Sequence, residues 1–224
     1  MQSRAFLERK LREGRCWKAG GGGSLGIANA IFTRRLLPLP SGSRRLRPPV
    51  THAARRRAAL QALATTLQQL AGTREIADTM IAIPHPYDKT YAEVWISSHA
   101  DAFARRTAVH FGITLKATGE LIGSVELHDI ETEHSQAELS FWVGKAWWGQ
   151  GYITEAARSV LGYGLYDLEL NRIYAYHMKR NPASGRVLHK LGMVQEGVLR
   201  QRVRKWGVFE DVAMCALLRQ DWDN

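Results

Sequence analysis

Cysteine is scarce in this chain: Cys16 and Cys215, near opposite ends of its 224 residues, are the only two. So low a number excludes a disulfide framework and a cysteine-rich zinc site, and it is typical of a reducing compartment such as the cytoplasm. No apolar run approaches the ~20 residues that a membrane-spanning helix needs, so we expect no membrane segment. The eight histidines follow neither an HExxH motif nor a zinc-finger spacing, so we expect no metal.

Acidic residues are nearly absent from the first 57 residues, which hold 12 Arg and 2 Lys against Glu8 and Glu13, a balance of +12. Residues 58–224 hold the other 17 basic and 19 acidic residues, a balance of −2, and the two parts sum to the net charge of +10. The basic character therefore belongs to an N-terminal arm. The overall charge does not identify a partner of the rest of the chain.

The arm, residues 1–42, contains a run of four glycines, the Pro-spaced segment at 36–40 and paired arginines. Glycine runs cost much entropy to order and dense like charge resists compaction, so we expect little fixed structure there. Three interpretations stay open. The arm is an extension without function or an over-long reading frame, a segment that binds nucleic acid or the ribosome, or a targeting peptide. Glu8 and Glu13 count against the last.

Residues 43–224 have the pattern of one globular domain. Apolar spacing predicts helices at 51–70, 89–103, 152–166 and 183–191, with Gly192 as the C-cap residue after the last. Short β-rich stretches predict strands at 110–116, 121–128, 137–143, 172–177, 193–204 and 207–218. The order of helices and strands predicts an α+β domain.

The segment at 137–157, AELSFWVGKAWWGQGYITEAA, carries the first candidate site. A predicted strand is followed by a turn with Gly149 and Gly151 and then at once by a helix. Glycine lets a ligand approach the main chain, and the free amides of a helix N-terminus bind phosphate groups. The Gly-Lys-Ser/Thr ending of a nucleotide-triphosphate loop and the spacing of a dinucleotide fingerprint are both absent. A plain strand-to-helix connection is the alternative.

A second segment follows at 181–193, NPASGRVLHKLGM, where Asn181 and Ser184 stand at a predicted helix start. Asn181 alone is explained by a helix N-cap. Together the two segments resemble the GNAT acetyltransferase superfamily, and more closely the branch with the ribosomal-protein N-terminal acetyltransferases. The resemblance runs from about residue 43 to 222 and includes SRRLRPP at 43–49 as a first strand, IPHPY at 83–87, GELIGSVEL at 119–127 and EDVAMCALLRQDW at 210–222.

This resemblance implies a mixed, mostly antiparallel and splayed sheet flanked by helices on both sides, with acetyl-coenzyme A in the opening. The family's pyrophosphate-binding turn maps onto 148–154. The backbone that pairs with the pantetheine arm maps onto Phe141 and Val143, and the positions that face the pantetheine and the sulfur map onto Asn181 and Ser184. The implied coenzyme-binding residues are Phe141, Val143, Trp148, Gly149, Gln150, Gly151, Tyr152, Ile153, Thr154, Asn181 and Ser184.

Direct acetyl transfer to an amine needs a base for the ammonium proton and a group near the departing sulfur, and it needs no metal. Glu138 is the candidate base, with a cross-strand surface pair as the alternative, and Ser184 is the candidate at the sulfur, with helix capping as the alternative. Many superfamily members have a tyrosine acid where this chain has Leu188, so a tyrosine mechanism is not expected. Ile153 replaces a common alanine, which is tolerable if its side chain faces the core.

The acceptor is left open between a protein N-terminal amine and a small amine. Glu126, Asp129, Glu131 and Glu133 either contribute to an acceptor groove or form a solvated loop, and Trp142 and Trp148 either line that groove or pack in the core or rim. Two other functions stay open: a coenzyme-A-binding sensor without turnover, and a nucleic-acid-binding module led by the arm. Monomer and homodimer are equally compatible with the sequence.

Overall fold

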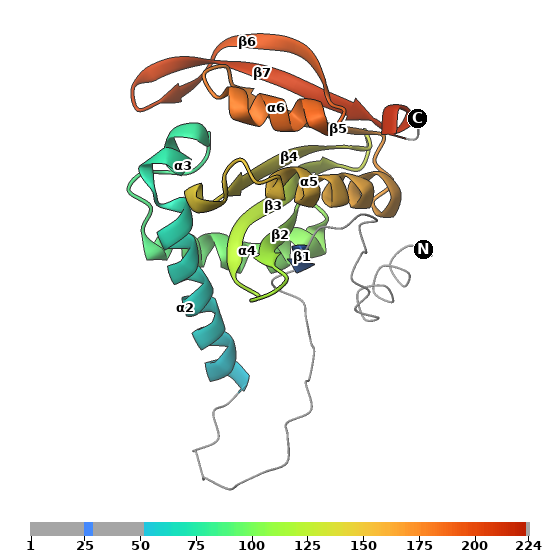
Figure 1. The fold of residues 1–224 in the computed structure, drawn as a ribbon. Helices are drawn as coiled ribbons and strands as arrows, with labels where there is room; N and C mark the ends of the chain where they lie inside the picture. The colour runs from blue at the N-terminus through green and yellow to red at the C-terminus, as the bar shows by residue number, and fades with distance from the viewer. Residues whose placement is uncertain (1–24, 29–51, 223–224) are drawn as a thin grey trace, which may run out of the picture.

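The computed structural model describes residues 25–28 and 52–222, which form a twisted sheet with helices on both faces (Figure 1). The strand order is β1-β2-β3-β4-β5-β7-β6. Every neighbouring pair is antiparallel except β4 and β5, which are parallel. The expected α+β class and mostly antiparallel sheet are therefore confirmed. The strands are β1 Leu25–Ala28, β2 Val109–Leu115, β3 Leu121–Glu131, β4 Gln136–Val143, β5 Arg172–Met178, β6 Val194–Lys205 and β7 Val208–Leu218.

Helices pack on both faces of the sheet. Residues of α2 and α4 pack together in one apolar cluster, and residues of α5 and α6 pack in a second cluster with the strands. The helices are α2 His52–Ala71, α3 Arg74–Thr79, α4 Lys89–Arg105, α5 Tyr152–Gly162, α6 Pro182–Lys190 and α7 Arg219–Trp222. No helix in the described part of the chain is both long and apolar enough to cross a membrane.

Strand alternation divides the side chains of β4 between the two faces. Ala137, Leu139 and Val143 are buried in the cluster with α5, whereas Trp142 is buried in the cluster with α2 and α4. The even-numbered positions of β4, Glu138 among them, therefore belong to the face that α2, α3 and α4 cover. The acidic candidate and the helix of the glycine turn lie on opposite sides of the sheet.

The sheet opens between β4 and β5. Only Gln136 to Glu138 pair with β5, opposite Arg172 to Tyr174, although β4 continues to Val143 and β5 to Met178. Beyond Glu138 the two strands diverge, which confirms the expected splayed sheet. The opening lies at the carboxyl ends of two parallel strands, the place where open sheets commonly bind ligands.

Most predicted elements are found within one to three residues of their expected ends, and Gly192 has a φ of 84° after α6. Helix α3 was not predicted from the sequence. The helix predicted at 152–166 is α-helical to Gly162 and continues as a π-helical turn, Tyr163–Asp167. A strand expected at 43–49 lies outside the described residues. β1 lies inside the arm, where little fixed structure was expected, and it pairs with Gly112 to Leu115 of β2.

Candidate acetyl-transfer site

The glycine turn before α5 presents free backbone amides. Gly149 and Gly151 have φ values of 74° and 86°, in the left-handed region that glycine adopts without strain. A Cβ built on either residue would meet nothing within 4 Å. The amide of Trp148 donates to the carbonyl of Lys145, and the next bonded amide along the chain is that of Glu155, which donates to the carbonyl of Gly151. Among the described residues, the amides from Gln150 to Thr154 have no hydrogen-bond partner, so the turn suits an anionic group.

The backbone of β4 is free along the opening. The amide of Gly144 donates to Ile122 of β3 over 2.8 Å, and backbone groups alternate across a strand. The N–H and C=O groups of Phe141 and Val143 therefore point away from β3, toward the space that β5 has left. The carbonyl of Val143 already accepts a hydrogen bond of 2.8 Å from Nε1 of Trp148, so only its amide remains for a ligand.

Trp148 has a structural role that the sequence did not indicate. Its indole ties the glycine turn to the end of β4, and its side chain is partly exposed beside the turn rather than in the acceptor cleft described below. Ile153 is buried in the core cluster with α5, so the condition set for the exchange of alanine, a side chain that faces the core, is met. Leu188 is buried in the same cluster and cannot act as an acid.

Asn181 and Ser184 contact each other at the start of α6. The side-chain carbonyl of Asn181 accepts the amide of Ser184 over 3.3 Å, which is an N-cap, and its Nδ2 donates to Oγ of Ser184 over 2.9 Å. Because Oγ of Ser184 accepts this bond, its own O–H remains available as a donor. Capping and a role at the sulfur are therefore compatible.

Glu138 and Ser184 line the same cleft, which has a volume of about 480 Å³. It lies where β4 and β5 diverge, and the segment between α3 and α4 forms one wall. Trp142 also lines it. Among the described residues that line the cleft, Arg202 is the only Lys or Arg. The other polar or aromatic lining residues are Thr79, Tyr87, Tyr91, Trp95, His110, Glu126, His128, Ser140, Phe141, Tyr176 and His177.

Burial raises the pKa of Glu138, the two nearby carboxylates Asp129 and Glu126 raise it further, and His128 and Arg202 oppose that rise. A carboxylate with a raised pKa is a stronger base than an ordinary one. Burial, followed by the charge of Glu138, raises the pKa of Tyr174 to about 12, so this phenol stays protonated opposite Glu138. The environment thus fits Glu138 for accepting a proton.

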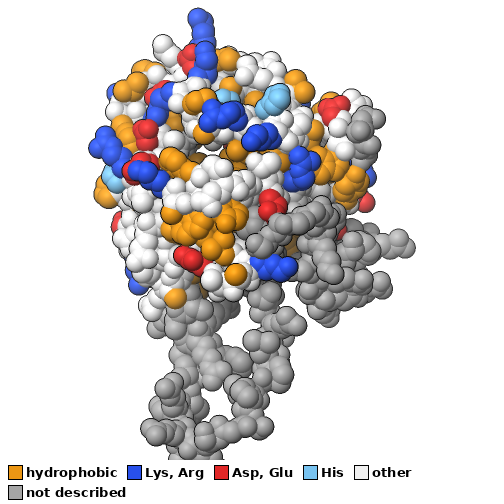
Figure 2. Space-filling model, viewed as in Figure 1, with side chains coloured by type: hydrophobic (Ala, Val, Ile, Leu, Met, Phe, Trp, Pro, Cys, Tyr) orange, Lys and Arg blue, Asp and Glu red, His pale blue; other side chains and the backbone are white. Residues whose placement is uncertain are grey.

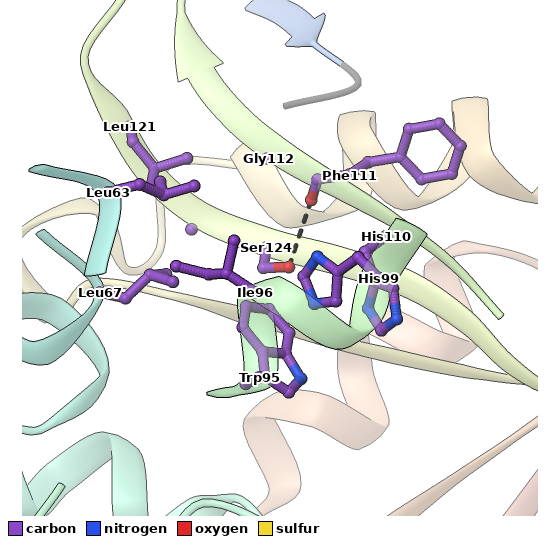
Figure 3. Close-up of a pocket in the computed structure, with 11 residues that line it drawn as sticks. Leu63, Leu67, Trp95, Ile96, His99, His110, Phe111, Gly112, Leu121 and Ser124 are labelled. Atoms are coloured by element: carbon purple, nitrogen blue, oxygen red, sulfur yellow. Dashed lines mark hydrogen bonds between the residues drawn. The ribbon is translucent and has the colours of Figure 1, made fainter. Parts of the chain in front are cut away.

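A histidine group forms the wall next to Glu126. Nδ1 of His110 is hydrogen-bonded to the carboxylate of Glu126, and the ring of His99 stacks on His110 with centroids 3.7 Å apart. Figure 3 shows both rings beside Trp95 at a small cavity of about 20 Å³. The sequence analysis considered Glu126 but missed His110 and His128. Alternation would have revealed His128, since Glu126 and His128 share one face of β3, whereas His110 lies opposite Glu126 on β2.

The other three acidic candidates do not line the cleft. Asp129, Glu131 and Glu133 are exposed, as the solvated alternative supposed, although Asp129 and Glu131 belong to β3 rather than to a loop and Asp129 contacts His128. Ligand atoms of His128, Asp129 and Glu138 lie within 4.8 Å of one another. This spacing alone does not establish a metal site, and the expected absence of metal stays a prediction.

Basic side chains gather over the upper part of the face that carries the turn (Figure 2). Figure 1 places α6 and the β6–β7 hairpin there, and the exposed residues of α6 include Arg186 and Lys190. Positive charge on this side complements an anionic ligand at the free amides of the turn.

A splayed sheet, free amides at the turn before α5 and an unpaired edge on β4 are features of an acyltransferase that takes an acyl-coenzyme A. Residues 56–194 match the family model described as acetyltransferase (GNAT) domain. The chain is 38% identical over 127 residues to the probable N-acetyltransferase YjcK of Bacillus subtilis, covering 56% of this chain and 70% of that one. It is 29% identical over 135 residues to the putative ribosomal N-acetyltransferase YdaF of Bacillus subtilis, covering 60% and 73%.

Solved structures agree with this fold. The spermidine N-acetyltransferase of Vibrio cholerae, solved in complex with CoA and spermine, has a TM-score of 0.64 at 23% identity, over 73% of this chain and 94% of that one. The chain belongs to the GNAT acetyltransferase family. Its reaction class is acetyl-CoA-dependent transfer of an acetyl group to an amine.

Proposed function

We propose that the protein acetylates a cationic amine at the cleft between β4 and β5. The single observation that supports this most is that Glu138 of β4 and Ser184 of α6 reach one cleft at the point where the sheet opens. Acetyl-CoA would bind as co-substrate along Phe141 and Val143, with its pyrophosphate at the turn from Trp148 to Thr154. The open amides, the absence of side chains over both glycines and the free strand edge fit this ligand.

In this proposal Glu138 takes one proton from the acceptor ammonium, which makes the nitrogen nucleophilic. The nitrogen attacks the thioester carbonyl and the C–N bond forms. As the C–S bond breaks, the second proton of the nitrogen passes to the departing sulfur, which leaves as the coenzyme A thiol. The hydroxyl of Ser184, oriented by Asn181, donates its hydrogen bond to the departing thiolate. Holding both substrates in one cleft supplies much of the remaining rate enhancement.

The cleft favours a positively charged acceptor. It holds the carboxylates of Glu126 and Glu138, and the aromatic rings of Tyr87, Tyr91 and Trp95 offer faces for a cation. The relatives point to two kinds of acceptor, since YdaF is named a ribosomal N-acetyltransferase and the Vibrio cholerae enzyme holds spermine. A peptide with a free N-terminus and a polyamine are therefore the first acceptors to test.

The test is release of the coenzyme A thiol from acetyl-CoA with a panel of such peptides and polyamines, with the product identified by mass. The wild type should acetylate at least one member. Glu138→Gln should lower kcat by about 10²-fold or more, in the range of lost general-base catalysis. Glu133→Gln, at an exposed acidic position away from the cleft, is the matched control. Coenzyme A binding without transfer to any amine would favour the non-catalytic sensor instead.

A further inference from the structure

Two side chains, His128 and Asp129, form a row from the half-buried Glu138 to solvent. His128 on β3 stands directly opposite Glu138 on β4, and its Nε2 lies 3.7 Å from Oε1 of Glu138. Nδ1 of the same ring lies 3.2 Å from Oδ2 of Asp129. Side-chain exposure rises along this row, from 20% for Glu138 to 28% for His128 and 69% for Asp129.

The contact between His128 and Asp129 depends on an irregularity in β3. Neighbouring residues of a regular strand point to opposite faces, so their side chains do not meet. Here the register shifts between His128 and Glu131, and Asp129 has a φ of 48°, which is uncommon for any residue other than glycine. The bulge brings the Asp129 carboxylate to the imidazole of its neighbour.

Distance decides which ring nitrogen of His128 carries the proton, because Nδ1 lies 3.2 Å from its carboxylate and Nε2 lies 3.7 Å from the other, beyond a hydrogen bond. An ionised carboxylate only accepts hydrogen bonds, so Nδ1 donates to Asp129. Nε2 then faces Glu138 with a lone pair. The ring can therefore accept a proton on one side and release another on the opposite side.

We propose that His128 and Asp129 carry the proton that Glu138 takes from the acceptor amine out to solvent. This inference rests on the proposed function. Glu138 gains a proton from the ammonium and gives it to Nε2 of His128, while the proton on Nδ1 passes to Asp129 and then to water. This leaves the proton of His128 on Nε2. The starting tautomer returns when Nε2 of the partly exposed ring gives that proton to water and Nδ1 takes one from water through Asp129, so one proton in total leaves the site. His128 touches no reacting atom and is a positioning and relay residue, not the base.

Other charged groups surround the row and belong to its pH response. Arg202 from β6 lowers the pKa of Glu138, and Glu126 from β3 raises it. Tyr174 from β5 pairs with Glu138 in register, and its raised pKa of about 12 keeps it neutral. Of the groups next to Glu138, His128 joins it to an exposed carboxylate.

The test variants are His128→Gln and Asp129→Asn. The control variants are His134→Gln and Glu133→Gln, which change exposed residues of the β3–β4 turn. In weak buffer, kcat should fall about tenfold in the first pair, less than the 10²–10⁴-fold expected when the base itself is lost. The KM for acetyl-CoA should stay unchanged. Added imidazole should restore kcat of His128→Gln without affecting the wild type, a response that a merely structural role would not give.

A second measurement does not depend on turnover. Nitrogen-15 NMR of labelled histidine should find the Nδ1–H tautomer of His128 in the wild type, and Asp129→Asn should alter it. An Nε2–H tautomer, or unchanged kcat in both variants, would overturn the relay. Loss of activity with a chelator, restored by zinc, would overturn it as well. A wild type that acetylates no amine would refute the proposed function, whereas the tautomer would still test the relay geometry.

Discussion

At the scale of single residues, the site depends on pairs that a sequence cannot reveal. Glu138 and Ser184 were identified from their places in two motifs, and the structure brings both to one cleft. The bonds that orient them come from cross-strand neighbours, as between His128 and Glu138. Strand alternation predicts which residues share a face, but the register that makes them partners depends on the bulge at Asp129.

The raised pKa of Glu138 predicts an acid limb in the pH profile. The base must be ionised to accept a proton, so kcat/KM should be retained above the pKa of Glu138 and fall as pH drops through it. Because burial raises this pKa, the fall should be centred above the ordinary value of 4.5. The measurement is kcat/KM against pH for the wild type and Glu138→Gln. If the fall in kcat/KM at low pH is the same in Glu138→Gln, the titrating group is not Glu138.

His99 predicts an acid-dependent loss of stability. It is 6% exposed and neither ring nitrogen has a hydrogen-bond partner among the described residues. Burial, followed by repulsion from His110, lowers its pKa to about 3 from 6.5. Protonation therefore favours the unfolded chain, and this residue removes stability as pH falls below 6.5 toward 3, with a maximum slope of about 1.4 kcal/mol per pH unit.

His99→Phe should abolish that part of the slope and be nearly neutral at pH 8, because a ring of similar shape replaces an unpaired polar one. Urea unfolding at pH 8 and pH 5 measures both effects. His189→Gln, at an exposed position of α6, should keep the slope of the wild type. Equal slopes in His99→Phe and the wild type would show that the ring is not buried in its neutral form.

At the scale of elements, the wall of the cleft between α3 and α4 is held by one buried lysine. Nζ of Lys205 on β6 donates to the carbonyls of Met80 and Ile83 over 2.8 and 2.7 Å. Arg180 adds a second tie, through Asp78 of α3 and Glu210 of β7. These contacts could not be predicted from the sequence, because Lys205 and Arg180 reach residues more than 100 positions away in the chain. Helix α3 itself was not predicted.

Lys205→Met should loosen this wall, because two carbonyls lose their donor. Each unpaired buried carbonyl costs about 1–3 kcal/mol unless water replaces the donor. We expect a lower free energy of unfolding and a rise in the KM for the acceptor that exceeds any fall in kcat. Arg200→Met, an exposed position on the same strand, is the control. An unchanged acceptor KM in Lys205→Met would exclude this segment from acceptor binding.

At the scale of the whole molecule, patterns within one element were predictable and contacts between elements were not. The glycine turn and both helix starts were visible because the sequence encodes them locally. The division at residue 42 remains a prediction, as do the cytoplasmic location and the choice between monomer and homodimer. β1 shows that part of the arm adds to the sheet.

Two truncations separate the arm from the domain. Removal of residues 1–24 should leave stability and acetyl transfer unchanged. Removal of residues 1–42 also deletes β1 and exposes the edge of β2 from Gly112 to Leu115, so the melting temperature should fall by about 2–4 °C for each kcal/mol lost. Any affinity for nucleic acid should fall when residues 1–42 are removed and should weaken with salt, because 6 Arg and 2 Lys against 2 Glu give that segment a charge of +6. Equal stability of both truncated chains would exclude a role for β1.

The central claim is that acetyl-CoA binds on the turn before α5. Its most direct test is the thermal stability of the wild type, Gly151→Trp and Gly119→Trp with and without coenzyme A. Gly119, in the β2–β3 turn, also has a positive φ, 72°, and open space around a built Cβ, so its variant carries the same backbone strain away from the site. At about 100 times the dissociation constant, the ligand should stabilise the wild type and Gly119→Trp by roughly 2.7 kcal/mol. Gly151→Trp should show no such shift. Equal shifts in all three proteins, or none in the wild type, would contradict the account.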